Sequence, residues 1–286
     1  MLKAYYAALK PERTYANVMT AAAGFLFACA WHVDWGLFVA TLVGTTLVVV
    51  SACAVNNVTD RGIDAYMPRT QHRGTVTGVV SARALVALAA ITGVLGFVML
   101  LRYVNVLTSL LGLIAYIDYV VLYAWSKRTT PWSTLIGTIS GAVPLVAGYT
   151  AVTGRFDLTA LLLGLVMVFW QMVHFYAIAI FRKKDYAAAK LPVWAVRYGV
   201  RSTQRWMLVY TVLYLIVIVY LAIYASTGWV FGVVVSALGV YWLYRGVSGF
   251  KALQPGTWAR GMFGFSLVNL LALSALLASS AVLARY

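Results

Sequence analysis

The chain has 286 residues, of which 63% are hydrophobic and only 10% charged, and its mean hydropathy is +0.87. Because soluble domains carry about a quarter charged residues, this composition excludes an ordinary soluble protein and indicates one that resides in a membrane. The net charge of +15 does not indicate a nucleic-acid partner, because the basic residues lie in short gaps between apolar runs, where they set the orientation of a multi-span protein.

Successive apolar stretches reach the length of about 20 residues that a helix needs to cross a bilayer. We therefore predict an all-α integral membrane protein with one transmembrane domain over residues 1–286. Its bundle would hold nine transmembrane helices, at residues 15–33, 36–55, 80–101, 104–125, 132–152, 158–181, 205–225, 228–246 and 261–284. Within the fifth helix, Gly137, Gly141 and Gly148 are spaced to permit close approach of a neighbouring helix.

The basic residues follow one side of these spans. Of the 22 Lys and Arg residues, all but Arg102, Arg155 and Arg285 fall in the N-terminal segment, in the gaps after spans two, four, six and eight, or at the span ends that border these gaps. By the positive-inside rule we expect a cytoplasmic N-terminus and a C-terminus outside. The basic segment before the first span has neither a cleavage-site pattern nor the composition of a transit peptide, which favours a retained first helix in the cytoplasmic (inner) membrane of a prokaryote.

Two cytoplasmic connections are much longer than the others, at residues 56–79 and 182–204, and we expect them to form the active-site face. Of the chain's seven acidic residues, Asp60, Asp64 and Asp185 lie at the cytoplasmic ends of spans. Asp118 lies within a span, where an ionisable side chain is costly and often functional, although it could also sit near a helix end or be paired.

The first acidic cluster has helical spacing. Asn56, Asp60 and Asp64 follow one another at intervals of four residues, so all three face one way on a helix. Two carboxylates on one face repel each other unless a cation lies between them, and magnesium suits this arrangement because it binds carboxylates together with substrate phosphates. Interleaved or downstream are Arg61, Arg69 and Arg73, whose guanidinium groups match phosphate oxygens.

A second cluster, Arg182-Lys183-Lys184-Asp185, supplies another carboxylate with adjacent cations in the long connection four spans later. Either cluster alone is also typical of a solvated, positively charged loop. Their joint occurrence at the ends of separate spans favours a magnesium–diphosphate site.

The motif NNVTDRGIDAYMPRTQHR, residues 56–73, resembles the N-x-x-x-D-R-x-I-D-x-x-M-x-R-T-x-x-R signature of the UbiA-type intramembrane prenyltransferases. Further stretches agree, namely GTISGAVPLVAGYTAVTGRFD, WQMVHFYAIAIFRKKDYAAAKLPV and WARGMFGFS, so the resemblance runs from about Lys10 to about Ser266. The segment HFYAIAIFRKKDY, with its intramembrane His174, resembles the branch of the family that farnesylates heme, the heme O synthases.

This resemblance implies an enzyme that transfers the farnesyl group of farnesyl diphosphate to a vinyl group of heme B, with water addition, giving heme O for terminal oxidases. Mg²⁺ would be its cofactor, and heme A synthase or terminal oxidase subunits are candidate partners besides the lipid bilayer. The implied metal ligands are Asn56, Asp60, Asp64 and Asp185, the three acids being the catalytic residues. The implied diphosphate-binding residues are Arg61, Arg69, Arg73, Lys127, Arg128 and Lys184.

The acceptor pocket is predicted at His174, Trp170 and Tyr176, and the aromatic residues that would shield a farnesyl cation are Tyr116, Tyr119 and Phe175. Aromatic residues in spans are also ordinary packing or interface residues. His174 could ligate or position heme, or it could hydrogen-bond a neighbouring helix, and the sequence leaves both open.

Some positions depart from the family's pattern. Gly62 stands where an Asp is usual, although that position points away from Asp60 and Asp64. Val173 replaces a usual Pro, Lys190 a usual Gly or small polar residue, and Trp194-Ala195 a usual Leu-Pro. The changes at 190–195 bear on the identity of the acceptor.

Three alternatives remain. The first is a prenyltransferase of the same family that acts on a quinone precursor or a lipid. The second is a transporter, which usually places its ionisable site near the midplane rather than at the surface. The third is a non-catalytic oxidase-assembly scaffold, which does not account for the acids on one helix face.

Overall fold

The computed structural model describes residues 2–225 and 227–283, and in these it contains helices, turns and short irregular links but no strand. Residue 284, the end of the last predicted span, and Arg285 lie outside the described residues. The long helices are α2 (Pro11–Cys29), α3 (Trp35–Asp64), α5 (Ala82–Tyr103), α6 (Val106–Ile117), α9 (Thr138–Thr153), α10 (Leu158–Phe181), α13 (Gly199–Tyr224), α14 (Trp229–Ser248) and α15 (Pro255–Leu283). The short helices are α1 (Leu2–Ala8), α4 (Gly74–Thr77), the π-helical η1 (Asp118–Leu122), α7 (Tyr123–Thr129), α8 (Ser133–Ile136), α11 (Lys183–Ala188), α12 (Trp194–Arg197) and the 3₁₀ turn η2 (Gly249–Lys251).

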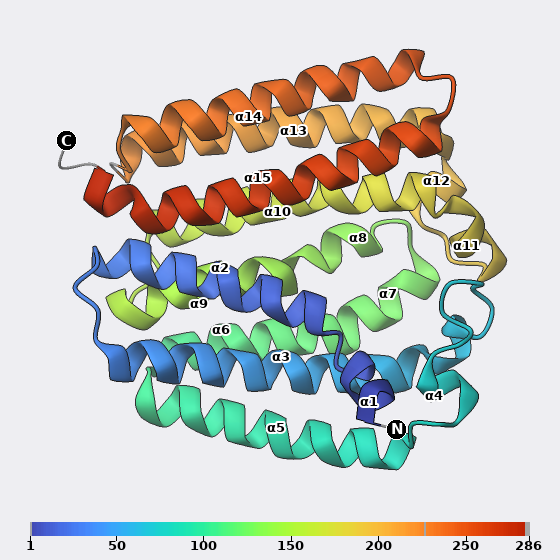
Figure 1. Ribbon diagram of the computed structural model, residues 1–286, viewed down its shortest axis with the longest axis horizontal. Coiled ribbons are helices and arrows are strands. Elements are labelled where there is room, and N and C mark those ends of the chain that lie inside the picture. The colour runs from blue at the N-terminus through green and yellow to red at the C-terminus, as the bar shows by residue number, and fades with distance from the viewer. Residues whose placement is uncertain (1, 226, 284–286) are drawn as a thin grey trace.

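Eight helical stretches among the described residues are long and apolar enough to cross a membrane, which makes the chain a multi-span membrane protein. α6, η1 and α7 run together as one of these stretches, and α8 with α9 forms another. α2, the first predicted span, is not among the eight, because its first turns carry Glu12, Arg13 and Asn17. It nevertheless packs along α9, α15 and α3 (Figure 1). The count of nine and the orientation of the termini stay predictions.

The structure corrects the predicted start of the first long connection and the end of the second. α3 continues to Asp64, nine residues past the predicted end of span two, as the helical spacing of Asn56, Asp60 and Asp64 requires. α13 begins at Gly199, several residues before the predicted span. In both cases tertiary contacts hold polar residues in the helix: Asn57 Nδ2 donates to the carbonyl of Ala8, and Gln204 Nε2 donates to the carbonyl of Gly249 at 2.8 Å. Hydropathy marks the part of a helix that suits the bilayer and not the point where the helix ends.

Close approach through glycine fixes α9 within the bundle, as the spacing predicts. A Cβ atom on Gly148 would lie 1.9 Å from the carbonyl oxygen of Ala21 in α2, and one on Gly24 of α2 would lie 2.1 Å from the carbonyl oxygen of Leu145. At Gly141 a Cβ would meet Gln171 Oε1 of α10 at 2.0 Å. At Gly148 and Gly24 no larger residue fits unless the helices move apart, whereas at Gly141 the Gln171 side chain would have to shift.

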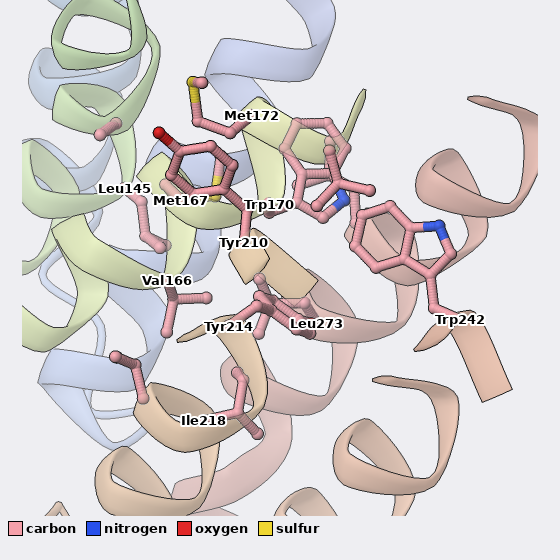
Figure 2. Packing of buried hydrophobic residues seen from close by; sticks show 14 of the residues in the cluster. Leu145, Val166, Met167, Trp170, Met172, Tyr210, Tyr214, Ile218, Trp242 and Leu273 are labelled. Carbon is pink, nitrogen blue, oxygen red and sulfur yellow. The ribbon is translucent and has the colours of Figure 1, made fainter. Parts of the chain in front are cut away.

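The largest buried cluster joins α10 to α13, α14 and α15. Figure 2 shows Trp170 of α10, Tyr210 and Tyr214 of α13, and Trp242 of α14 among the aliphatic and methionine side chains of this core. The rings of Tyr214 and Trp242 meet edge to face, with their centroids 5.9 Å apart. α10 therefore lies between α9 on one side and α13 and α15 on the other, where its residues can line a site between these helices.

Both long connections lie at the same end of the bundle. Figure 1 shows α4, the turn between α7 and α8, α11 and α12 gathered at that end, while the turns from α2 to α3 and from α13 to α14 lie at the other. The basic and acidic residues that these connections carry are therefore brought together.

Candidate active site

The first acidic motif lies on successive turns at the C-terminal end of α3, as its spacing predicts. Asn56 and Asp64 are buried, and the side chain of Asp60 is 17% exposed. A Cβ atom on Gly62 would meet nothing within 4 Å, so this position faces open space. The Asp that the family usually has here would therefore not contact the other acids.

Each of these acids pairs with a cation from another segment. Lys127 of α7 forms an ion pair with Asp60, and Arg73 Nη1 lies 2.6 Å from Asp64 Oδ2. Arg128 Nη2 donates to the carbonyl of Thr59 at 2.7 Å. Three of the predicted phosphate-binding cations, Lys127, Arg128 and Arg73, are thus collected around the end of α3. A buried carboxylate needs such partners, because removing one leaves an uncompensated charge.

Two basic residues that the sequence analysis assigned only to membrane orientation also enter the site. Lys10 Nζ donates to Asn56 Oδ1, which also accepts a hydrogen bond from the Tyr119 hydroxyl at 3.2 Å. Arg13 Nη1 in turn donates to the Tyr119 hydroxyl at 2.8 Å. Burial, and then repulsion by Arg13, lower the pKa of Lys10 to about 7. The only sequence signal for these residues is their place beside Pro11 at the start of α2, because the contacts span 46 and 106 residues of chain.

Asp185 does not join the acids of α3 in this structure. It lies on α11 with Oδ2 3.6 Å from Nη1 of Arg182. Among residues 2–225 and 227–283, no group of three or more His, Cys, Asp or Glu side chains is close enough to hold a metal ion. Burial raises the pKa of the neighbouring Tyr186, and the charges of Arg69 and Arg13 oppose that rise, so α11 lies within electrostatic reach of both guanidiniums.

Arg61 and Lys184 are exposed, and neither forms an ion pair within the described part of the chain. The structure therefore gives no contact that links either of them to the acids.

The donors on α3 fit a magnesium ion. Two carboxylates and a carboxamide are the hard oxygen ligands that Mg²⁺ accepts, and the surrounding cations match the phosphate oxygens that complete such sites. Asn56 Nδ2 is buried without a hydrogen-bond partner among the described residues, while its oxygen is held by Lys10 and Tyr119. The Asn56 amide thus belongs to the group of polar side chains at the end of α3 and not to the apolar packing.

The predicted aromatic residues separate into two groups. Tyr119 stacks on Tyr123 with ring centroids 5.9 Å apart, and Lys127 Nζ lies 5.3 Å from the centroid of Tyr123, so these rings adjoin the acids. Tyr116 instead lies near Ser51, with their hydroxyl oxygens 3.2 Å apart, and packs edge to face on Phe97.

Asp118 has a structural explanation. It begins the π-helical η1, and its Oδ2 accepts a hydrogen bond at 3.0 Å from the backbone N–H of Ser140 in the first turn of α9. A carboxylate there satisfies an N–H group that the helix itself leaves unpaired and suits the positive end of the helix dipole. Because the extra residue of a π-turn rotates the helix beyond it, η1 also sets the direction of Tyr119, Tyr123 and Lys127.

His174 lies on α10 within a group of aromatic rings. Its Nδ1 is 2.6 Å from the Ser266 hydroxyl oxygen of α15, its ring stacks on Trp170 with centroids 4.9 Å apart, and the Phe175 ring meets it edge-on at 5.3 Å. Tyr176 is not part of this group, because it is buried against Trp194 and Tyr210 toward α12 and α13. Of the predicted acceptor residues, the structure brings His174 and Trp170 together.

A model of the UbiA prenyltransferase family matches residues 17–276, which is most of the chain. The chain belongs to the UbiA prenyltransferase family. Membership assigns prenyl transfer as its reaction class. A relative from Pseudomonas fluorescens (strain Pf0-1), named protoheme IX farnesyltransferase 2, is 40% identical over 277 residues, covering 96% of this chain and 94% of that protein.

Solved structures of the UbiA family share the fold. The structure of a digeranylgeranylglyceryl phosphate synthase is similar with a TM-score of 0.81 at 15% identity, covering 98% of each chain. A UbiA homologue from Archaeoglobus fulgidus, solved with GPP and Mg²⁺, has a TM-score of 0.74 at 14% identity, covering 96% of this chain and 99% of that one. At these identities the likeness establishes the architecture and leaves the acceptor to be argued from this chain's own residues.

Proposed function

We propose that this UbiA-family protein transfers the farnesyl group of farnesyl diphosphate to a vinyl group of heme B, with addition of water, to give heme O. The observation that carries the proposal is the pairing of Asp60 and Asp64 with Lys127 and Arg73 at the end of α3. The name of the Pseudomonas fluorescens relative supports the choice of heme as acceptor.

Asn56, Asp60 and Asp64 would hold Mg²⁺, with Asp185 as a further ligand if α11 moves toward α3. The metal would supply positive charge to the phosphate oxygens of the bound diphosphate. Metal binding would release Lys127 and Arg73 from their carboxylates, and these cations could then bind the diphosphate. Arg69, Arg128 and Arg13 are close enough to this end of α3 to add to the same positive field, and Arg61 and Lys184 are the more distant candidates.

Breaking the allylic C–O bond leaves both electrons on the diphosphate oxygen, so the fixed cations around α3 act where negative charge develops. The farnesyl carbon becomes positive in the same step, and the faces of Tyr119 and Tyr123, which adjoin the acids of α3, would shield it. Enclosure within the helix bundle would keep water away until a heme vinyl group attacks that carbon. Trp170, His174 and Phe175 would line the acceptor's side.

The bacterial relative and the apolar helices support a location in the cytoplasmic membrane of a prokaryote, where terminal oxidases use heme O. Heme A synthase or oxidase subunits would then receive the product.

The experiment uses purified protein in detergent with heme B, farnesyl diphosphate and Mg²⁺, with mass spectrometry of the product. We expect a Mg²⁺-dependent product that carries a farnesyl group plus water, and we expect its loss in Asp60→Asn, which keeps the shape of the side chain but removes its charge. Arg155→Gln on the opposite end of the bundle is the matched control. Turnover with a quinone precursor or a lipid but not with heme would show that heme is not the acceptor. Inactivity of a folded protein with every acceptor would contradict prenyl transfer itself.

A further inference from the structure

A continuous row of rings runs along α10 and α15 from the end that bears the long connections toward the interior of the bundle. Phe181 meets Phe263 edge to face with centroids 5.7 Å apart, Phe263 lies 4.8 Å from the His174 ring, and His174 stacks on Trp170 at 4.9 Å. We call these four residues the ring wall. Trp170 Nε1 donates to the carbonyl of Ser266 at 2.9 Å, which fixes the two helices to each other along the wall.

The two hydrogen bonds of Ser266 favour one tautomer of His174. The Ser266 hydroxyl donates its only proton to the carbonyl of Phe263 at 2.5 Å. Its oxygen therefore accepts the hydrogen bond from Nδ1–H of His174 at 2.6 Å. In this tautomer Nε2 carries the lone pair. Nε2 makes no hydrogen bond to the described residues, and it is not among their fully enclosed polar atoms.

An imidazole held in this way has the arrangement of a metal-binding histidine. Such residues usually donate their other ring N–H to an acceptor, which fixes both the tautomer and the ring orientation. The second interpretation of His174, as a residue that merely joins two helices, explains the bond to Ser266 and leaves Nε2 without a hydrogen-bond partner among the described residues.

Two guanidinium groups stand at the outer end of the ring wall. The guanidinium carbons of Arg182 and Arg260 lie 5.4 Å and 5.9 Å from the centroid of the Phe181 ring. Arg260 makes no ion pair within residues 2–225 and 227–283, and Arg182 has only Asp185 at 3.6 Å. Both therefore have hydrogen-bonding capacity left for an anionic ligand, and guanidinium groups match carboxylates well.

We propose that the ring wall is the binding site for the heme acceptor, with His174 Nε2 as the iron ligand and with Arg182 and Arg260 binding the two propionate carboxylates. The inference rests on the proposed function and deepens it by assigning the orientation of the acceptor.

Each part of the wall matches one part of heme. The apolar macrocycle meets the edges of the His174 and Trp170 rings, whose planes differ by 21°, the Lewis-acidic iron takes the imidazole lone pair, and the carboxylates remain with the arginines at the end of the bundle. His174 and Phe181 are seven residues apart on α10, which at 1.5 Å per residue is a rise of about 10 Å. The iron and the propionate edge of one porphyrin can therefore occupy the two levels of the wall at His174 and Phe181.

The first test is a spectroscopic titration of the purified full-length protein in detergent with ferric heme B. We expect a visible absorption and electron paramagnetic resonance spectrum of histidine-ligated heme, lost in His174→Ala and restored when imidazole is added to His174→Gly. Ser266→Ala, which removes the acceptor of Nδ1–H, should weaken heme binding about 10-fold or more. His32→Ala, in an exposed turn, is the matched control and should leave the spectrum unchanged. An unaltered heme spectrum in His174→Ala would overturn the iron ligand.

The second test compares heme with its dimethyl ester, in which the propionate charges are blocked. The wild type should bind heme about 10-fold or more tightly than the ester, because the ester cannot form the charge-assisted hydrogen bonds of a free carboxylate. Arg260→Gln should lose most of this preference, because the substitution weakens binding of heme and leaves binding of the ester unchanged. Lys251→Gln, an exposed cation near the same end, should keep the preference. Equal preference in the wild type and in Arg260→Gln would overturn the propionate assignment.

The same preparations separate failure of the inference from failure of the proposed function. Farnesylation of heme by the wild type, together with unchanged heme binding in His174→Ala and Arg260→Gln, would leave the function and overturn the ring wall. Histidine-ligated heme binding without any farnesylated product would support the wall and overturn the function.

Discussion

Lys127 forms an ion pair with Asp60, the carboxylate that the proposed Mg²⁺ ion would also bind. This ion pair is largely buried, so in the absence of Mg²⁺ each side chain neutralises the charge of the other. We predict that Lys127→Met binds Mg²⁺ more tightly than the wild type in the absence of substrate, because the competing cation is gone. The same variant should turn over about 100-fold or more slowly, because a fixed positive group is then missing where the diphosphate gains charge. Mg²⁺ titration monitored by thermal unfolding, and the product assay, measure the two effects.

The opposite signs of these effects distinguish competition from a general loss of structure. Arg155→Met breaks an exposed pair with Asp157 at the other end of the bundle and should change neither quantity. Weaker Mg²⁺ binding in Lys127→Met would show that the lysine supports the metal site instead of competing with it.

At the scale of single residues, periodicity predicted what depends on one helix, whereas contacts between helices came only from the family resemblance, were left open or were missed. The spacing of Asn56, Asp60 and Asp64 is a property of α3 alone, so periodicity was sufficient. The approach of Arg13 to Tyr119, and of Ser266 to His174, joins segments 106 and 92 residues apart. No local pattern encodes such contacts, and composition alone made Arg13 look like an ordinary orienting charge.

At the scale of helices, the contact between α2 and α9 depends on the absence of side chains. We predict that Gly148→Ala lowers the free energy of unfolding by about 1–3 kcal/mol, because its Cβ would lie 1.9 Å from the carbonyl oxygen of Ala21. Gly264→Ala in α15, where a Cβ would meet nothing within 4 Å, should instead be neutral or stabilising by up to about 1 kcal/mol. Thermal unfolding in one detergent compares the two. Equal changes in the unfolding temperature of the two variants would mean that helix propensity rather than close packing governs both sites.

The existence of the helices was predictable from hydropathy, and their local form was not. The apolar run at 104–125 gives no sign that η1 interrupts it, because the π-turn is coupled to the bond between Asp118 and Ser140 on the next helix. The break between α8 and α9 likewise depends on a contact, in which Gln171 Nε2 donates to the carbonyl of Thr138 at 3.1 Å. Hydropathy averages over these irregular turns, although they direct side chains into the site.

At the scale of the whole molecule, the unequal distribution of charge between the two ends of the bundle predicts a topology. The end with α4, α11 and α12 carries most of the basic residues, so it should face the cytoplasm (Figure 1). In a background with Cys29 and Cys53 replaced, a membrane-impermeant maleimide should label Arg155→Cys in intact cells. Lys184→Cys should react only after the cells are permeabilised. The reverse pattern would invert the orientation.

The same labelling determines whether α2 crosses the membrane. α2 has 19 residues, just enough for a span of about 30 Å, but its first turn is polar. If it crosses, Lys3→Cys and His32→Cys lie on opposite sides, and only His32→Cys is labelled in intact cells. Labelling of both would leave α2 as a helix that enters and returns, with eight spans. We expect opposite sides, because Lys10 just before α2 donates to Asn56 at the acidic end of α3, whereas the turn after Cys29 leads directly into the other end of α3.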